Sequence, residues 1–220
     1  MAQEITRIDL GGFNCYLIHT GGGFALVDTG LAARRGALEK ALQAAGCTPG
    51  SLRLVLITHA DVDHVGNCAY LQERYRAPIA AHREEAGFLQ GDASAPNRKP
   101  RPDRMPFLFR LVMGLSGRRA TFTCRPDVLL EDGQDLAPYG LAARALHLPG
   151  HTRGSLGILT ADGALYCGDL FANWRRPALH GIIDDLPAAR ASLDRLRRLD
   201  VRTVYPGHGK PFALEQVRAE

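Results

Sequence analysis

The first 30 residues alternate short apolar runs with glycine-rich breaks. Residues 5–10, 13–19 and 24–27 are segments of strand length that contain apolar residues, separated at Gly11-Gly12 and at Gly21-Gly22-Gly23. Short apolar runs bounded by glycine are typical of strands joined by tight turns. The pattern therefore predicts an antiparallel meander at the start of the chain.

Helical and buried-strand patterns follow the meander. Residues 31–45 place leucines on one face and charged residues elsewhere, and Gly46 stands where a helix would end. The unbroken apolar run 54–57 predicts a strand that is buried on both faces. Residues 67–76 then predict a second helix, and residues 78–81 a short strand.

The second half of the chain repeats this order of strands and then a helix. The predicted strands cover residues 128–130, 141–148, 155–160, 164–167 and 202–205, and the predicted helix covers 186–199. Strands followed by a helix, twice over, indicate two similar halves in an α/β (α+β) fold. The length of 220 residues suits one domain, 1–220, with a full hydrophobic core.

One region, residues 91–125, breaks the pattern. It opens with a loop-like composition rich in proline, and a short helix is expected only over residues 107–115. Eight of its side chains are basic and two are acidic. Two interpretations stay open: an ordinary solvated insertion, or a flap that recruits an anionic or amphiphilic substrate. Binding of nucleic acid is disfavoured, because no aromatic residues are interleaved with the basic ones for stacking on bases.

Four potential metal ligands crowd into the turn after the buried strand 54–57. They are His59, Asp61, Asp63 and His64. Ligands in α/β folds usually bind at strand ends, and imidazole with carboxylate suits zinc, iron or manganese. Alone, this cluster could also be a polar loop with two incidental histidines, because short metal-like motifs have false positives.

Three distant residues strengthen the metal interpretation. His151, Asp169 and His208 each follow a strand-like segment and stand among glycines, where the backbone can turn sharply. Together with Asp28-Thr29-Gly30, the set resembles the metallo-β-lactamase superfamily of metal-dependent hydrolases. That family's signature is His-x-His-x-Asp-His, followed by a His, an Asp and a His in this order. The resemblance spans residues 14–209 and implies a four-layer αββα sandwich.

The resemblance also implies roles for these residues. The implied ligands of a first metal are His59, Asp61 and His151, those of a second are Asp63, His64 and His208, Asp169 bridges the two, and Asp28 supports the ligands from behind. Two divalent ions, zinc first among them, would share a hydroxide made from water. The hydroxide would attack a small carbonyl substrate such as a thioester, lactone or ester. Asp63 would pass a proton to the leaving group.

The motif departs from the family at one position, because Asp61 stands where the family has its second histidine. Carboxylate is a harder ligand than imidazole, which shifts the preference from zinc toward iron or manganese. The flavodiiron oxygen reductases, a related branch, carry a glutamate at the matching place. The alternative is that Asp61 points away and the first site is weak or empty.

The segment after Asp169 holds the candidate substrate contacts. They are Trp174, Arg175, Arg176 and His180. Arg175 and Arg176 could pair with a carboxylate or phosphate, and Trp174 could pack against an acyl group. A solvated loop with one anchoring tryptophan is an equally good interpretation. Cys167, two residues before Asp169, is interpreted as a buried thiol.

The composition indicates a cellular compartment for the protein but does not identify its substrate. The five cysteines are odd in number and scattered, which argues against a disulfide framework. With neither a signal-like N-terminus nor an apolar run long enough for a membrane span, a cytoplasmic protein is expected. A homodimer is left open. A metal-dependent hydrolase is the leading hypothesis, and a nuclease or phosphodiesterase or an iron-binding redox protein are the alternatives, because one metal site serves many chemistries.

Overall fold

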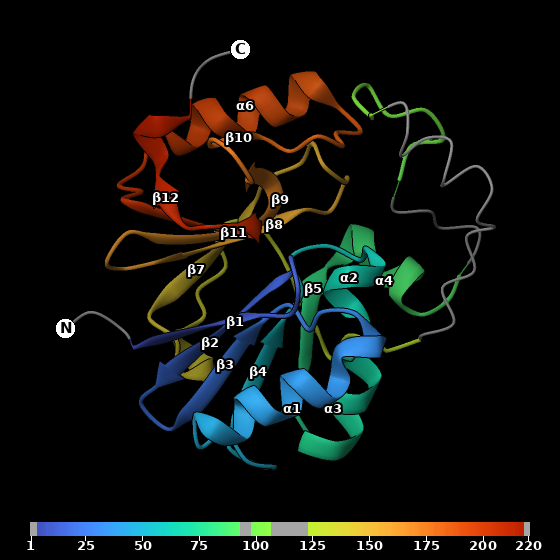
Figure 1. Ribbon diagram of the computed structural model, residues 1–220, viewed down its shortest axis with the longest axis vertical. Coiled ribbons are helices and arrows are strands. Elements are labelled where there is room, and N and C mark those ends of the chain that lie inside the picture. The colour runs from blue at the N-terminus through green and yellow to red at the C-terminus, as the bar shows by residue number, and fades with distance from the viewer. Residues whose placement is uncertain (1–3, 93–97, 107–122, 218–220) are drawn as a thin grey trace.

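Two β-sheets lie face to face with helices on their outer surfaces (Figure 1). The structure is a computed structural model, and it describes residues 4–92, 98–106 and 123–217. Helices α1 (Arg35–Ala44) and α3 (Cys68–Tyr75) cover the first sheet, and α6 (Leu186–Leu196) covers the second. This arrangement is the predicted four-layer αββα sandwich.

The first sheet is built from the N-terminal half of the chain. Its six strands run in sequence order: β1 (Ile5–Asp9), β2 (Asn14–Thr20), β3 (Gly23–Val27), β4 (Leu52–Leu56), β5 (Ile79–His82) and β6 (Val128–Leu130). Strands β1 to β3 pair antiparallel, as the glycine-punctuated pattern predicts. Strands β3 to β6 pair parallel, so the chain leaves β4 and β5 at the same edge of the sheet.

The second sheet comes from the C-terminal half. Its strands are β7 (Ala143–His147), β8 (Leu156–Thr160), β9 (Ala164–Asn173), β10 (Ala178–Leu179), β11 (Thr203–Gly209) and β12 (Phe212–Ala213). Strands β7, β8 and β9 form an antiparallel meander, and β11 lies parallel to β9. The two halves therefore share a plan of meander and then parallel strand.

Three apolar layers fill the spaces between the four structural layers. Leu38 and Leu42 of α1 pack with one face of the first sheet. The inner layer joins the two sheets, with Tyr16 from β2 and Tyr166 from β9 among its largest side chains. Leu193 belongs to the third layer, between α6 and the second sheet. Burial on both faces of each sheet explains why the strands read as continuous apolar runs.

Two strands are longer than predicted. The sequence pattern ends them at Cys167 and Tyr205, whereas β9 continues to Asn173 and β11 to Gly209. The strands stay paired through register shifts on either side of Pro206, and Gly168 takes a left-handed φ of 50°. Asp169 and His208 therefore lie within irregular strands, where the sequence pattern places them in loops.

Smaller differences concern helices. Two short helices were not predicted, α2 (Val62–Val65) and α4 (Arg83–Leu89), and α1 follows the 3-10 turn η1 (Ala32–Arg34). The expected helix 107–115 and most of the insertion 91–125 lie outside the described residues. Within the described ranges, no helix combines the length and apolar character that a membrane span needs.

Candidate metal centre

The predicted ligands converge at one edge of the sandwich, where the two sheets meet. His59 and Asp61 follow β4, and Asp63 and His64 lie on α2. The remaining three come from the second half: His151 from the loop after β7, Asp169 from β9 and His208 from β11. Their donor atoms gather in groups with all members within 4.8 Å of one another.

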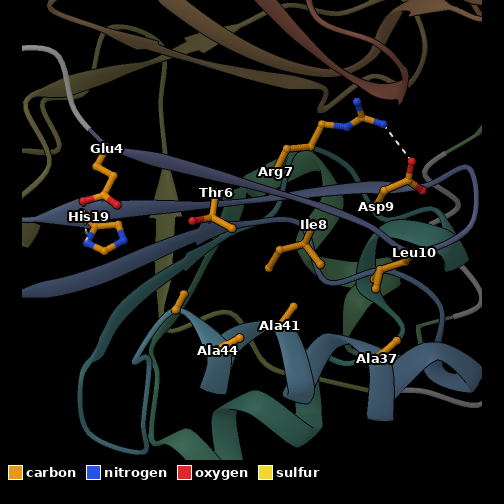
Figure 2. Close-up of a pocket in the computed structure, with 11 residues that line it drawn as sticks. Glu4, Thr6, Arg7, Ile8, Asp9, Leu10, His19, Ala37, Ala41 and Ala44 are labelled. Carbon is orange, nitrogen blue, oxygen red and sulfur yellow. Dashed lines mark hydrogen bonds and ion pairs between the residues drawn. The ribbon is translucent and has the colours of Figure 1, made fainter.

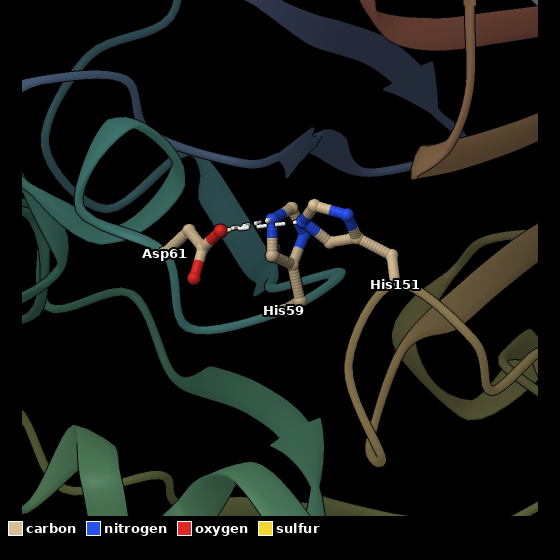
Figure 3. A group of neighbouring side chains, drawn as sticks. All are labelled: His59, Asp61 and His151. Atoms are coloured by element: carbon tan, nitrogen blue, oxygen red, sulfur yellow. Dashed lines mark hydrogen bonds and ion pairs between the residues drawn. The ribbon is translucent and has the colours of Figure 1, made fainter. Parts of the chain in front are cut away.

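The first cluster consists of His59, Asp61 and His151 (Figure 3). Asp61 Oδ2 lies 3.6 Å from His59 Nε2 and 3.2 Å from His151 Nε2. Ligands bound to one zinc ion at about 2.0–2.1 Å stand roughly 3.3 Å apart when the geometry is tetrahedral. The spacing of the first cluster therefore suits one ion, and Asp61 points toward the centre.

The second cluster consists of Asp63, His64 and His208. Asp63 Oδ2 lies 3.8 Å from His64 Nε2 and 3.4 Å from His208 Nε2. Asp169 Oδ1 lies 3.4 Å from His64 Nε2, and its Oδ2 lies 3.1 Å from His208 Nε2. Asp169 is therefore a fourth potential ligand of the second cluster, with Oδ1 beside His64 and Oδ2 beside His208.

Asp169 also faces the first cluster. Its Oδ2 lies 3.7 Å from His151 Nε2 and 4.0 Å from His59 Nε2. The lack of a side chain at Gly207 leaves room for the Asp169 carboxylate, because a Cβ at residue 207 would stand 2.3 Å from Asp169 Oδ1. Asp169 therefore lies between the two clusters, where a bridging carboxylate would be.

Asp28 orients two of the histidines from behind. Its Oδ2 accepts a hydrogen bond from His64 Nδ1 at 2.8 Å and one from the Thr58 hydroxyl at 2.8 Å. The Thr58 oxygen in turn lies 3.0 Å from His59 Nδ1. With both Nδ1 atoms used as donors, the Nε2 lone pairs of His59 and His64 point into the centre. Asp28 does not cap the helix that follows it, because neither the turn η1 nor α1 has a side-chain cap.

Backbone carbonyls orient the other two ligand histidines. His151 Nδ1 lies 2.7 Å from the carbonyl oxygen of Ile182, and His208 Nδ1 lies 2.8 Å from that of Gly12. Each Nδ1 donates its proton to the carbonyl, so each Nε2 is the ring nitrogen that faces the centre and that can bind a metal in the neutral imidazole. All four histidines therefore show the arrangement that metal-binding histidines use.

Several buried atoms of the centre have no hydrogen-bond partner among the described residues. They are His59 Nε2, His64 Nε2, Asp169 Oδ1 and His180 Nε2. Buried polar atoms are almost always satisfied, so a group of orphans needs an explanation. Lone pairs and carboxylate oxygens that face one another are what a divalent cation would satisfy. The residues fit the metal that the sequence motif implies.

The carboxylates of the centre are held ionised. Burial acts to raise the pKa of Asp169, but His208 and His64 outweigh it and hold that pKa well below its usual range. Burial likewise acts to lower the pKa of His208, but Asp169 and Asp63 raise it to about 10. The centre therefore favours positive charge strongly, as a cation site should.

Sequence reasoning missed one residue of the centre, Arg98. Its Nη2 lies 2.7 Å from Asp61 Oδ2 and 3.1 Å from His151 Nε2, and its side chain is only 8% exposed. The sequence shows Arg98 merely as one basic residue of the insertion 91–125. No local pattern could have revealed the contact, because its partners lie 37 and 53 positions away in the chain.

The candidate substrate contacts divide into two kinds. His180 is buried, with Nε2 3.8 Å from Asp169 Oδ2, and it forms a further group of potential ligands with His151 and Asp169. The Trp174 ring is 66% exposed and lies 5.6 Å from the His180 ring and 5.6 Å from the His208 ring. Arg175 and Arg176 are exposed beside it. The segment after Asp169 therefore borders the centre.

A separate hollow lies between β1 and α1 (Figure 2). Its volume is about 600 Å³, and Ala37, Ala41 and Ala44 line one side. It shares no residue with the metal centre, so it stands apart from the chemistry of that centre. The five cysteines are all buried and unpaired, as expected for Cys167 and for a chain without disulfides.

Comparisons with known proteins agree with this geometry. A hydroxyacylglutathione hydrolase from Acidiphilium cryptum is 30% identical over 91% of this chain and 65% of its own length. An atrochrysone carboxyl ACP thioesterase from Aspergillus fumigatus is 26% identical over 92% of this chain. The chain spans only 52% of that thioesterase.

Solved structures show the same fold. A metallo-beta-lactamase family protein from Thermus thermophilus superposes with a TM-score of 0.71 and 26% identity. The match covers 97% of this chain and 76% of that protein. The family model of the metallo-beta-lactamase superfamily matches residues 8–208, and the chain therefore belongs to that superfamily of metallo-hydrolases.

Proposed function

We propose that this metallo-hydrolase acts on a small carbonyl substrate, with a thioester as the leading class and a lactone or ester as related substrates. The observation that carries the proposal is the pair of ligand clusters around Asp169, with Asp63 in the second cluster beside His208. Two relatives bear the names of thioester-cleaving enzymes, a hydroxyacylglutathione hydrolase and an acyl carrier protein thioesterase. Their substrates support the class only, because the chain spans 65% and 52% of their lengths.

A divalent metal, zinc first among the candidates, would supply Lewis acidity toward the carbonyl oxygen and lower the pKa of water. The second cluster and Asp169 would hold it. The protein's own contribution is to orient these ligands rigidly through Asp28 and through the carbonyls of Ile182 and Gly12. Rigid, desolvated ligands need no rearrangement during the reaction.

Asp63 is the residue assigned to proton transfer. Burial acts to raise its pKa, but His64 and His208 outweigh it, so the pKa of Asp63 is lowered and the carboxylate is ionised at neutral pH. An ionised carboxylate can accept a proton from attacking water and then donate it to the departing thiolate or alkoxide.

The exposed Trp174 lies next to His208 of the metal centre and offers an apolar face to the acyl part of a substrate. Arg175 and Arg176 are exposed nearby and suit a carboxylate or phosphate on the substrate. These two features favour an amphiphilic, anionic thioester over a small neutral ester.

The nuclease alternative rests on the basic residues of the insertion 91–125, and ion pairs within the protein weaken that support. Arg98 is paired with Asp61 and Asp184, and Lys99 Nζ lies 2.8 Å from Asp185 Oδ2. Basic side chains that already pair with carboxylates, buried in the case of Arg98 and at the surface in the case of Lys99, attract phosphates less than unpaired ones do. The phosphodiesterase alternative is therefore best treated as the control reaction in the assay.

The test is hydrolysis by protein that has been stripped with a chelator and reloaded separately with zinc, iron(II) or manganese. Acyl thioesters of glutathione and pantetheine, simple lactones and a phosphodiester serve as substrates. We expect thioesters to give the highest kcat/KM and Asp63→Asn to lower kcat by about 10²–10⁴-fold. Asp194→Asn, an exposed carboxylate on α6, is the matched control. Faster hydrolysis of the phosphodiester would contradict the proposal.

A further inference from the structure

The Arg98 guanidinium stands where the first cluster would hold a metal. We propose that Arg98 replaces that cation, and that the chain binds a single metal ion in the second cluster with Asp169. The proposal rests on the proposed function only in taking the centre to be metal-dependent. It concerns residues of this chain, because the family motif alone implies two ions.

The contacts of Arg98 are made to the atoms that a first metal would use. Nη2 donates to Asp61 Oδ2 at 2.7 Å and to His151 Nε2 at 3.1 Å, and Nε donates to Asp61 Oδ1 at 3.3 Å. Asp61 thus receives the two parallel hydrogen bonds that arginine makes to a carboxylate. Two of the three ligands in the first cluster are engaged in this way.

His151 Nε2 has a single lone pair, and both Arg98 and a metal ion would need it. Its Nδ1 carries a proton toward the carbonyl oxygen of Ile182 at 2.7 Å, so Nε2 has one lone pair and no proton. That lone pair already accepts the hydrogen bond from Arg98. A lone pair cannot accept a hydrogen bond and coordinate a metal at the same time, so the two are mutually exclusive at this atom.

The charge of Arg98 would also repel a metal ion bound in the first cluster. An ion bound to both Asp61 Oδ2 and His151 Nε2 at about 2.1 Å would lie within roughly 4 Å of Arg98 Nη2, because Nη2 contacts the same two atoms. A divalent ion and a guanidinium at that separation, in a desolvated site, repel strongly. The ion and the arginine would have to exchange places.

Arg98 is built into the centre and has no donor to spare. Its Nη1 donates to the carbonyl oxygen of His151 at 2.6 Å and to Asp184 Oδ1 at 3.3 Å. With the three contacts from Nε and Nη2, each of its five N–H groups has an acceptor. Asp184 also accepts from the backbone of Lys99 at 2.7 Å, which fixes the segment that carries Arg98. The guanidinium therefore supplies charge to the centre and has no N–H left for a substrate.

The second cluster lacks this kind of cation among the residues that the structure describes. Its orphan atoms include His64 Nε2 and Asp169 Oδ1, which lie 3.4 Å apart and have no hydrogen-bond partner in those parts of the chain. In the first cluster only His59 Nε2 is left without one there. A single ligand holds an ion weakly, whereas the second cluster with Asp169 offers four donor atoms. The geometry thus favours one ion, bound there.

Metal stoichiometry tests the proposal. Metal-free protein is titrated with cobalt(II), and bound metal is counted by elemental analysis after gel filtration. Trp174, the chain's one tryptophan, lies 5.6 Å from the His208 ring, so its fluorescence follows occupation of the second cluster. We expect one ion per chain in the native protein and two in Arg98→Met. Arg101→Met, an exposed position in the same segment, should stay at one.

Two results would overturn the proposal: two ions in the native protein, or one in Arg98→Met. If Arg98→Met fails to fold, Asp61→Asn decides instead. Asp61 binds Arg98 in our proposal, so Asp61→Asn should keep one ion with unchanged affinity, and a lost ion or a weaker first ion would refute it. Two ions with thioester hydrolysis would overturn only this proposal, whereas one ion without hydrolysis would overturn only the proposed function.

Discussion

The Glu85 carboxylate accepts a hydrogen bond from the Thr152 hydroxyl at 2.7 Å, and this contact joins the two halves of the molecule. Glu85 lies on α4 and is fully buried. Its oxygens also accept from the backbone N–H groups of Ala60 at 2.9 Å and Gly154 at 3.0 Å. One carboxylate therefore fixes the loop after β4 and the loop around His151, which together carry the first cluster.

Glu85→Gln should destabilise the protein by about 1–3 kcal/mol, because the amide nitrogen would face one of three donors and leave it unsatisfied. The measurement is urea unfolding at neutral pH with saturating metal. Glu84→Gln is the matched control, since Glu84 is the exposed neighbour on the same helix. A change below roughly 0.5 kcal/mol, the size expected of a surface substitution, would show that the three hydrogen bonds contribute little.

Asp28→Asn should weaken metal binding by about 10–100-fold, the usual effect of removing a partner of a ligand histidine. Asp28 accepts hydrogen bonds from His64 Nδ1 and from the Thr58 hydroxyl, and an amide nitrogen cannot accept either. His64 would then lose the tautomer that points its Nε2 lone pair at the metal. Competition with a chelating dye gives the affinity. Asp194→Asn should leave it unchanged, and an equal loss in both variants would rule out an orienting role for Asp28.

The fold is largely predictable from the sequence, because it depends on local patterns, and the candidate ligands named from the sequence motif lie together in the structure. Glycine-bounded apolar runs give the strands, and each ligand lies near the end of a recognisable run. The predicted extents of β9 and β11 were wrong because Gly168 and Pro206 normally end strands, whereas parallel pairing in this fold continues across the irregularities. The sequence of one strand does not show which distant strand it pairs with.

The contacts that specialise the centre were not predictable for the same reason. Arg98 meets Asp61 across 37 positions, and Glu85 meets Thr152 across 67. A basic residue in a proline-rich insertion and an acidic residue on an unpredicted helix both look like solvated charges in the sequence. Only the tertiary arrangement shows that they are buried and paired.

Trp174→Ala should raise KM for thioesters with long acyl chains by roughly tenfold and leave kcat nearly unchanged. The ring is 66% exposed in the free protein, so covering it with an acyl chain gains binding energy that an alanine cannot supply. Steady-state kinetics with short and long acyl chains separates this from a general defect. Trp174→Phe keeps an apolar ring and should resemble the native enzyme. A fall in kcat with both chain lengths would instead place Trp174 in the support of His208.

The stacked pair of His82 and His147 should make stability depend on pH. The rings lie 4.2 Å apart and nearly parallel, and His82 Nδ1 accepts a hydrogen bond from the backbone of Glu84 at 3.3 Å. Burial, and then His147, lower the pKa of His82 to about 4, with Arg83 acting in the same direction and Glu84 and Asp132 against it. The neutral imidazole is the form that fits the folded state.

The sign of the effect follows from where His82 gains its proton. In the unfolded chain it does so near pH 6.5, and in the folded protein near pH 4. Between these values the unfolded state binds more protons, so stability should fall as the pH drops from 6.5 to 4 and this contribution should level off below 4.

Urea unfolding of the native protein and of His82→Asn at several pH values between 7.5 and 4 measures this contribution. Asparagine keeps a side-chain oxygen for the Glu84 backbone N–H but does not titrate in this range. The other histidines contribute to both proteins, so the difference between the two curves isolates His82. We expect the native protein to lose more stability than His82→Asn below pH 6.5. Parallel curves for the native protein and His82→Asn would mean that His82 accepts its proton as readily in the fold as in the unfolded chain.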